Sequence, residues 1–310
     1  MQIKTIKQNI TAKLNEWLAT IKDQTLRDDL KKNILVSGGC ITSMLLNEQV
    51  NDYDIYIYDI DVLKRLTTYY IKSYKQITLL DGRNKEILVN DLETDYSNLV
   101  KATALAIDMN TSYAISLRNL KPDQIKLYFA GAQGGMKVNK AMPKEELNYT
   151  PLYFSPNAIS LSNNLQIVIR FWGTAEQIHQ TFDFIHATNY FTFADGLVTN
   201  IAALESILTK QLKYQGSYYP VTSIIRAKKF IKKGFNINAG ELLKIMFQIS
   251  QLNLSSPDVL EEQLIGVDVA YFDLLITALR NKQTSDDKFK LSSQYLNILI
   301  DKIFNESEDL

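Results

Sequence analysis

Residues 34–58 read ILVSGGCITSMLLNEQVNDYDIYIY and combine apolar runs, a glycine pair and two closely spaced acids. It opens with three apolar residues that favour strands, passes through the glycine pair Gly38-Gly39, and closes on alternating polar and apolar side chains. The pattern predicts a short strand, a tight turn, a short helix and a second strand. Because strand side chains repeat every two residues, Asp52 and Asp54 are expected on one face of that second strand.

The two aspartates need an explanation, because acids are poor strand formers and like charges on one face repel each other. One interpretation is a solvated strand edge, and the other is a divalent cation held between Asp52 and Asp54. The turn and the helix start also leave unpaired backbone N–H groups that suit a phosphate. Ser37 and Ser43 would add hydroxyl donors beside the glycine pair, or would serve only as helix-capping residues.

Gly38-Gly39, a spacer of twelve residues and Asp52-Tyr53-Asp54-Ile55 resemble the nucleotidyltransferase signature of the DNA polymerase β superfamily. The resemblance implies an α+β fold, in which a mixed-sheet catalytic domain is followed by an all-helical domain. It also implies transfer of a nucleoside monophosphate from a nucleoside triphosphate (NTP) to a hydroxyl, with release of pyrophosphate. The acceptor would be an RNA 3′ end, a protein side chain or a small molecule. Residues 159–184 and 223–235 are similar to uncharacterised nucleotidyltransferase-like proteins of large phages and viruses.

The same resemblance implies a third acid on a later strand, between apolar neighbours, and residues 182–184 (FDF) match best. The implied catalytic residues, which would bind two Mg²⁺ or Mn²⁺ ions, are Asp52, Asp54 and Asp183. The implied phosphate contacts are Gly38, Gly39, Ser37 and Ser43. Gln166, on the preceding strand, lies where an acid could otherwise be sought, but an amide cannot replace a carboxylate.

Hydrophobic periodicity divides the chain into three predicted parts. Residues 1–24 form an amphipathic helix packed on the catalytic domain, residues 25–198 form the catalytic domain with an insertion, and residues 199–310 form a helical domain. Within the catalytic domain, NAISLSNNLQIVIRFWG predicts a β-hairpin, GTAEQIHQTF a short helix with a threonine cap, and FDFIHATNYFTF an alternating strand. Residues 76–130 hold the strand candidates QITLL, EILVN, SYAISL and QIKLYFAG and a helix near SNLVKATALAI.

A basic stretch lies in the helical part of the chain. No acid occurs between Ser206 and Gly240, while lysine and arginine accumulate there, Lys228 and Lys229 among them. One interpretation is an ordinary solvated helix face. The other is a wall for the bound triphosphate at Lys228 and Lys229, or a track for RNA or another polynucleotide acceptor, because cationic side chains neutralise phosphates.

Composition sets further expectations. Lysine and arginine number 34, as do aspartate and glutamate, so no overall field favours nucleic acid or anionic lipid. The single cysteine, Cys40, fits a reducing compartment, and we expect no signal peptide and no membrane span. A cytoplasmic protein without a membrane partner is predicted, in the host cytoplasm if a phage encodes it. Two alternatives stay open: a catalytically inactive phage structural or regulatory protein, and a nucleic-acid-binding module built on the basic helix.

Overall fold

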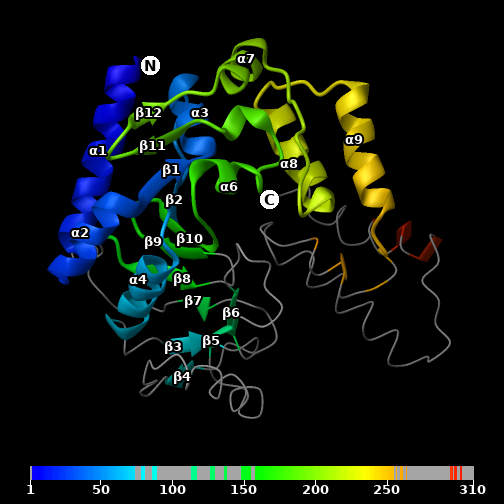
Figure 1. The fold of residues 1–310 in the computed structure, drawn as a ribbon. Helices are drawn as coiled ribbons and strands as arrows, with labels where there is room; N and C mark the ends of the chain where they lie inside the picture. Colours follow the sequence, from blue (N-terminus) through cyan, green and yellow to red (C-terminus); the bar gives the residue numbers. More distant parts are fainter. Residues whose placement is uncertain are drawn as a thin grey trace. The chain divides into compact units, whose positions relative to one another are not determined.

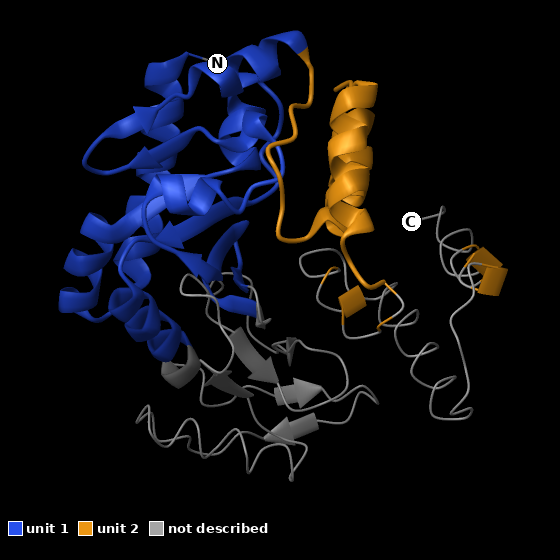
Figure 2. Cartoon of the chain, turned by 45° about the vertical axis from the view of Figure 1, so that its right-hand side comes forward, with its two compact units in different colours: residues 1–209 blue, residues 210–310 orange. Residues whose placement is uncertain are grey.

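The computed structural model describes residues 2–73, 148–154 and 158–254, five short strands between residues 78 and 137, and scattered positions from 256 to 301. The chain divides into two compact units, residues 1–209 and 210–310 (Figure 2). Each unit is described by itself below. The predicted domain boundary at residues 198–199 stays a prediction.

The first unit is built on an eight-stranded mixed sheet with the order β12-β11-β1-β2-β10-β9-β8-β7 (Figure 1). The central strand β2 runs antiparallel to β1 and parallel to β10. The predicted fold class, an α+β mixed sheet, is therefore confirmed. The strands of this sheet are β1 (Ile34–Ser37), β2 (Tyr53–Ile57), β7 (Met136–Lys137), β8 (Pro151–Phe154), β9 (Ala158–Leu161), β10 (Leu165–Trp172), β11 (Tyr190–Thr192) and β12 (Gly196–Val198).

Two separate two-stranded ribbons complete the described strands. The first pairs β3 (Thr78–Leu80) with β4 (Glu86–Leu88), and the second pairs β5 (Tyr113–Ser116) with β6 (Lys126–Phe129). Each of these strands falls inside one of the four candidates in residues 76–130, so the four strand predictions are confirmed. The helix expected near residues 97–107 lies outside the described residues.

Helices cover both faces of the large sheet. One face packs against α1 (Ile3–Thr20), α2 (Gln24–Asn33), α3 (Gly39–Leu45) and α4 (Ile60–Ser73), and together they form the main core. The other face packs against the short helix α6 (Ala175–His179). The 3₁₀ turn η2 (Ile185–Ala187) and α7 (Ile201–Thr209) follow in the chain. The amphipathic helix expected at the N-terminus is α1, whose apolar stripe is fully buried.

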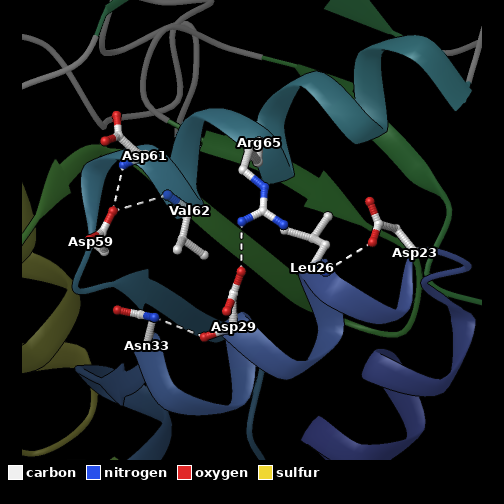
Figure 3. Close-up of polar contacts among 8 residues, drawn as sticks. All are labelled: Asp23, Leu26, Asp29, Asn33, Asp59, Asp61, Val62 and Arg65. Carbon is white, nitrogen blue, oxygen red and sulfur yellow. Dashed lines mark hydrogen bonds and ion pairs between the residues drawn. The ribbon is translucent and has the colours of Figure 1, made fainter.

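Helix α2 was not expected from the sequence, because only two of its residues, Leu26 and Leu30, are buried. Its N-terminus is capped by Asp23, whose carboxylate accepts a bond from the Leu26 N–H at 2.9 Å. An ion pair of 2.6 Å between Asp29 and Arg65 joins α2 to α4 (Figure 3). Tertiary packing and this cap therefore form a helix that its weak apolar pattern does not predict.

Helix caps and a hairpin turn are the other local features of the first unit. Asp59 caps α4 by accepting bonds from the backbone N–H groups of residues 61 and 62 (Figure 3). Thr174 and Gln177 form a capping box at the start of α6, which confirms the threonine cap. The hairpin of β9 and β10 is also confirmed, and its turn residues Asn163 and Asn164 adopt positive φ values of 61° and 56°. Such values suit the two-residue turn that matches the twist of paired strands.

One strand prediction is wrong. Residues 182–193 (FDFIHATNYFTF) form a bend, the turn η2 and then the short strand β11, rather than a continuous strand. Their apolar alternation has another cause: Phe184 is buried beside the bend, while Phe182 stacks on Tyr56 of β2 with ring centres 5.9 Å apart. Asp183 therefore lies in a connection between elements and not on a strand.

The second unit contains the helices α8 (Pro220–Lys232) and α9 (Ala239–Ser250) among its described elements. Both match helices expected from the sequence. The helices predicted after residue 254 fall almost wholly outside the described residues. Within the described part of the chain, no helix combines the length and the apolar character that a membrane crossing needs.

A buried hydrogen bond ties α1 to α4 inside the main core. The indole N–H of Trp17 donates to the hydroxyl of Tyr70 at 2.7 Å, and both side chains are almost fully buried. Replacing Tyr70 with phenylalanine removes the acceptor and leaves the indole N–H buried without it.

We predict that Tyr70→Phe lowers the free energy of unfolding by about 1–3 kcal/mol, the usual cost of an unsatisfied buried donor. The measurement is urea unfolding followed by circular dichroism. Tyr69→Phe is the matched control, because the Tyr69 hydroxyl bonds the exposed backbone N–H of Lys22 at 3.0 Å, which water can satisfy instead. Equal losses of unfolding free energy in the two variants would contradict a stabilising role for the buried Trp17–Tyr70 hydrogen bond.

Candidate functional site

The candidate site begins with the alternation of side chains along β2. Ile55 and Ile57 are fully buried in the main core, whereas Tyr56 points to the opposite face and packs under α6. Asp54 shares the face of Tyr56 and is half-buried, and Asp52, just before the strand, is exposed. Both Asp52 and Asp54 were expected on one face of this strand, but β2 begins at Tyr53, so Asp54 lies within the strand and Asp52 directly before it.

Gly38 brings the glycine pair up to Asp54. Its φ of 94° and ψ of −150° belong to a region that essentially only glycine adopts. A β-carbon on Gly38 would lie 3.4 Å from Oδ2 of Asp54. The backbone N–H of Gly38 donates to the carbonyl oxygen of Ala187 at 3.1 Å, which holds the turn against η2. We call Gly38, Gly39, Asp52 and Asp54 the corner.

A row of polar residues extends from the corner across the sheet. In the parallel pairing of β2 and β10, Gln166 lies opposite Asp54, and in the antiparallel pairing of β10 and β9, Ser160 lies opposite Gln166. Residues opposite each other on neighbouring strands share a face. All three side chains are half-buried. The sheet thus presents Asp54, Gln166 and Ser160 side by side where the cover of α6 ends.

Ser37 has a structural task instead of the predicted phosphate contact. Its side chain is fully buried, and its hydroxyl donates to the carbonyl oxygen of Asn189 at 2.8 Å. Its Oγ also lies 2.9 Å from Nε2 of His179 on α6. A phosphate therefore cannot reach Ser37, and the structure corrects that prediction. Ser43 is also buried, at 5% exposure on α3, and its role stays a prediction.

The third predicted acid is not placed as expected. Asp183 is 4% exposed and lies in the connection between α6 and η2. Among the described residues, no three histidine, cysteine, aspartate or glutamate side chains form a group that could hold a metal ion. Asp52, Asp54 and Asp183 therefore do not assemble the three-acid set. Beside Asp54, the neighbouring strand supplies Gln166, an amide, instead.

The pair of acids in the corner is the part of the site that fits a divalent cation. Mg²⁺ is usually bound by one or two carboxylates together with substrate phosphates, rather than by an all-protein cage. Asp52 and Asp54 supply carboxylates, and the bare backbone at Gly38 leaves room beside Oδ2 of Asp54. The donor set thus fits one cation that arrives with a triphosphate.

The contact between His179 and Ser37 was not predicted from the sequence. It joins α6 to β1 through Ser37, and the two residues are 142 positions apart, so no local pattern indicates the contact. Burial lowers the pKa of His179 to about 4, although the carboxylate of Glu176 favours the charged ring.

The basic helix predicted around residues 223–235 is α8, in the second unit. Lys228 and Lys229 are exposed on it. Their contact with a triphosphate or a polynucleotide stays a prediction.

A mixed sheet whose Asp-x-Asp strand meets a glycine pair at the start of a short helix is the α+β arrangement that residues 34–58 predict. The family is more particular: the model described as Gabija anti-defense 2 family protein matches residues 8–210, and the chain belongs to this family.

A curated relative, Gabija anti-defense 2 of Bacillus phage SPbetaL7, is 24% identical over 156 residues. The match covers 47% of this chain and 39% of the relative, so the chain spans well under half of that protein's length.

Solved structures of CCA-adding enzymes are also similar to the chain. The Thermotoga maritima enzyme complexed with tRNA gives a TM-score of 0.37 at 11% identity, over 96% of this chain and 62% of that one. The Bacillus stearothermophilus enzyme in complex with CTP gives a TM-score of 0.38 at 11% identity, over 86% and 52%. Likeness at this level says nothing of the substrates of the present chain.

We predict opposite outcomes for alanine at the two adjacent glycines. Gly38→Ala forces a side chain into a backbone conformation that essentially only glycine adopts, and this strain lowers the free energy of unfolding by about 1–3 kcal/mol. Gly39→Ala is the matched control, because nothing lies within 4 Å of its β-carbon position and it begins helix α3. Alanine favours helices, so this variant keeps or gains stability, by up to about 1 kcal/mol. Chemical unfolding of both variants checks the pair, and an equal loss of stability at both positions would refute the requirement for glycine at position 38.

His179 predicts a pH dependence of stability. Its folded-state pKa of about 4 lies below the ordinary value of 6.5, so between these pH values the unfolded chain binds more protons than the folded one. Stability from this group is therefore complete above pH 6.5 and is lost as the pH falls toward 4. Urea unfolding at intervals across this window should show a steeper loss in the wild type than in His179→Gln. Parallel curves for the two proteins would contradict the prediction.

Proposed function

We propose that the chain is a metal-dependent nucleotidyltransferase and that it acts against host defence through this activity. The corner would transfer a nucleoside monophosphate from an NTP to a hydroxyl of an acceptor. One observation carries the proposal: the Asp54 carboxylate lies against Gly38, a turn residue that has no side chain to block a ligand. The setting would be the cytoplasm of the infected host.

The reaction balances at the α-phosphorus. The acceptor oxygen forms a bond to this atom, the bond to the bridging oxygen of the β-phosphate breaks, and pyrophosphate leaves. The acceptor proton passes to water. Mg²⁺ or Mn²⁺, when bound, supplies positive charge that neutralises the triphosphate and the leaving group.

The chain's own residues position these groups. Asp52 and Asp54 would bind the cation, and strand β2 fixes Asp54 because its neighbours Ile55 and Ile57 are fully buried in the core. The backbone at Gly38 and Gly39 would lie against the phosphates, because the absence of side chains permits close approach. Asp183 is not part of this proposal, since the structure does not group it with the other two acids.

The basic face of α8 bears on the identity of the acceptor. Lys228 and Lys229 are exposed on α8, where no acid interrupts the stretch from Ser206 to Gly240. We infer that this basic face contacts phosphate groups, of the NTP or of a polynucleotide acceptor such as RNA. A protein or small-molecule acceptor would not need these lysines.

The test is a transfer assay with labelled nucleotides. Each NTP is supplied in two forms, labelled at the α- or the γ-phosphate, with Mg²⁺ and with RNA and protein from cells that carry a Gabija system. We expect the α-label, and not the γ-label, to enter a macromolecule. An Asp52→Asn/Asp54→Asn double variant should lower the rate by about a hundredfold or more, the typical loss when charge stabilisation at a reacting centre is removed.

Asp61→Asn is the control, because it makes the same chemical change on a carboxylate that is 78% exposed at the start of α4. Its rate should equal that of the wild type. Transfer of the γ-label would replace the proposal with phosphoryl transfer. Undiminished transfer of the α-label by the double variant would refute the assignment of the corner.

A further inference from the structure

The two strands that flank Asp54 determine how much negative charge the corner can offer. On one side, β10 places Gln166 opposite Asp54. On the other side, β1 pairs antiparallel with β2, with Val36 opposite Ile55, and continuing that register by one residue sets Ser37 opposite Asp54. Both lateral neighbours of Asp54 are thus uncharged.

Neither neighbour can replace a carboxylate ligand. Ser37 is fully buried and its hydroxyl donates to Asn189. Gln166 offers a neutral carbonyl oxygen and an NH₂ group with two donors. Beyond it, Ser160 adds only a hydroxyl to the same face. No group of three acidic, histidine or cysteine side chains around a common point exists in the part of the chain that the structure describes.

Charge and ligand type together limit the number of cations. A pair of divalent ions about 4 Å apart needs carboxylates that bridge or flank both ions, because their own charges repel. Among the described residues, the corner offers Asp52 and Asp54, a set that suits a single Mg²⁺ completed by substrate phosphates. The amide donors of Gln166 instead suit an oxygen acceptor, such as a phosphate oxygen or the Asp54 carboxylate.

We propose that the corner binds its NTP with one divalent cation. Gln166 lies beside Asp54, where a further acidic ligand would otherwise lie, and its neutral side chain limits the number of bound cations to one. The inference rests on the proposed function, since it presumes that a nucleotide binds at the corner. Gln166 is accordingly a specificity-determining residue of the site and not a metal ligand. A glutamate at this position would convert the corner into a site for two cations.

The test is equilibrium dialysis of the whole chain with Mn²⁺ and a non-hydrolysable α,β-methylene NTP analogue. The quantity measured is the ratio of retained Mn²⁺ to retained nucleotide. We expect a ratio of one for the wild type and of two for Gln166→Glu. The matched control is Gln8→Glu, which makes the same change at an exposed position of α1 and should give a ratio of one.

A second variant keeps the inference testable if Gln166→Glu does not fold. Gln166→Ala should keep the ratio of one and change the Mn²⁺ affinity by less than about tenfold, because losing even an indirect metal partner costs tenfold or more. A larger loss would make Gln166 a ligand and overturn the inference.

The remaining outcomes separate this inference from the proposed function. A wild-type ratio of two would overturn the one-cation site while leaving nucleotidyl transfer standing. A ratio of one in folded Gln166→Glu would also overturn it, because the side chain would then lie away from the cation. Failure of the wild type to retain nucleotide at all would refute the proposed function and this inference together.

Discussion

The turn at Gly38 leaves the space beside the carboxylate of Asp54 free of a side chain, and the rest of the candidate site depends on that arrangement. A β-carbon at residue 38 would lie 3.4 Å from Oδ2 of Asp54, and the backbone there has a φ of 94° that only glycine adopts without strain. This turn is itself held by a hydrogen bond from the backbone N–H of Gly38 to the carbonyl oxygen of Ala187. A carboxylate, a bare backbone and a fixed third segment are thereby brought to one point of the sheet.

Packing on the two sheet faces explains why this point is rigid. The main core holds β2 from one side through Ile55 and Ile57, with helices α1 to α4 around them. On the other side, α6 packs on Tyr56 and its neighbours, and His179 reaches Ser37 at 2.9 Å. Asp54 lies where this second layer ends and is left half-buried. A charged group in that position keeps contact with solvent while its backbone is fixed by the core.

Local chemistry made much of this fold predictable. The glycine pair, the alternation along β2, the capping box of α6 and the asparagine turn of the hairpin each depend on residues a few positions apart. The pairing of β10 with β2 and the contact of His179 with Ser37 depend on segments far apart in the chain, and no local pattern encodes them. Asp183 was misplaced for a related reason: its aromatic neighbours alternate as in a strand, but they pack against the core from a bend.

In the proposed mechanism, the corner is the point where a nucleotide and its cation meet the chain. Affinity cleavage tests this most directly: Fe²⁺ replaces Mg²⁺, and ascorbate with peroxide generates hydroxyl radicals that cut the backbone beside the bound ion. We expect cuts near residues 37–39 and 52–54 that appear only when an NTP is present. Cleavage that ignores the nucleotide, or nucleotide-dependent cuts confined to other segments, would contradict it.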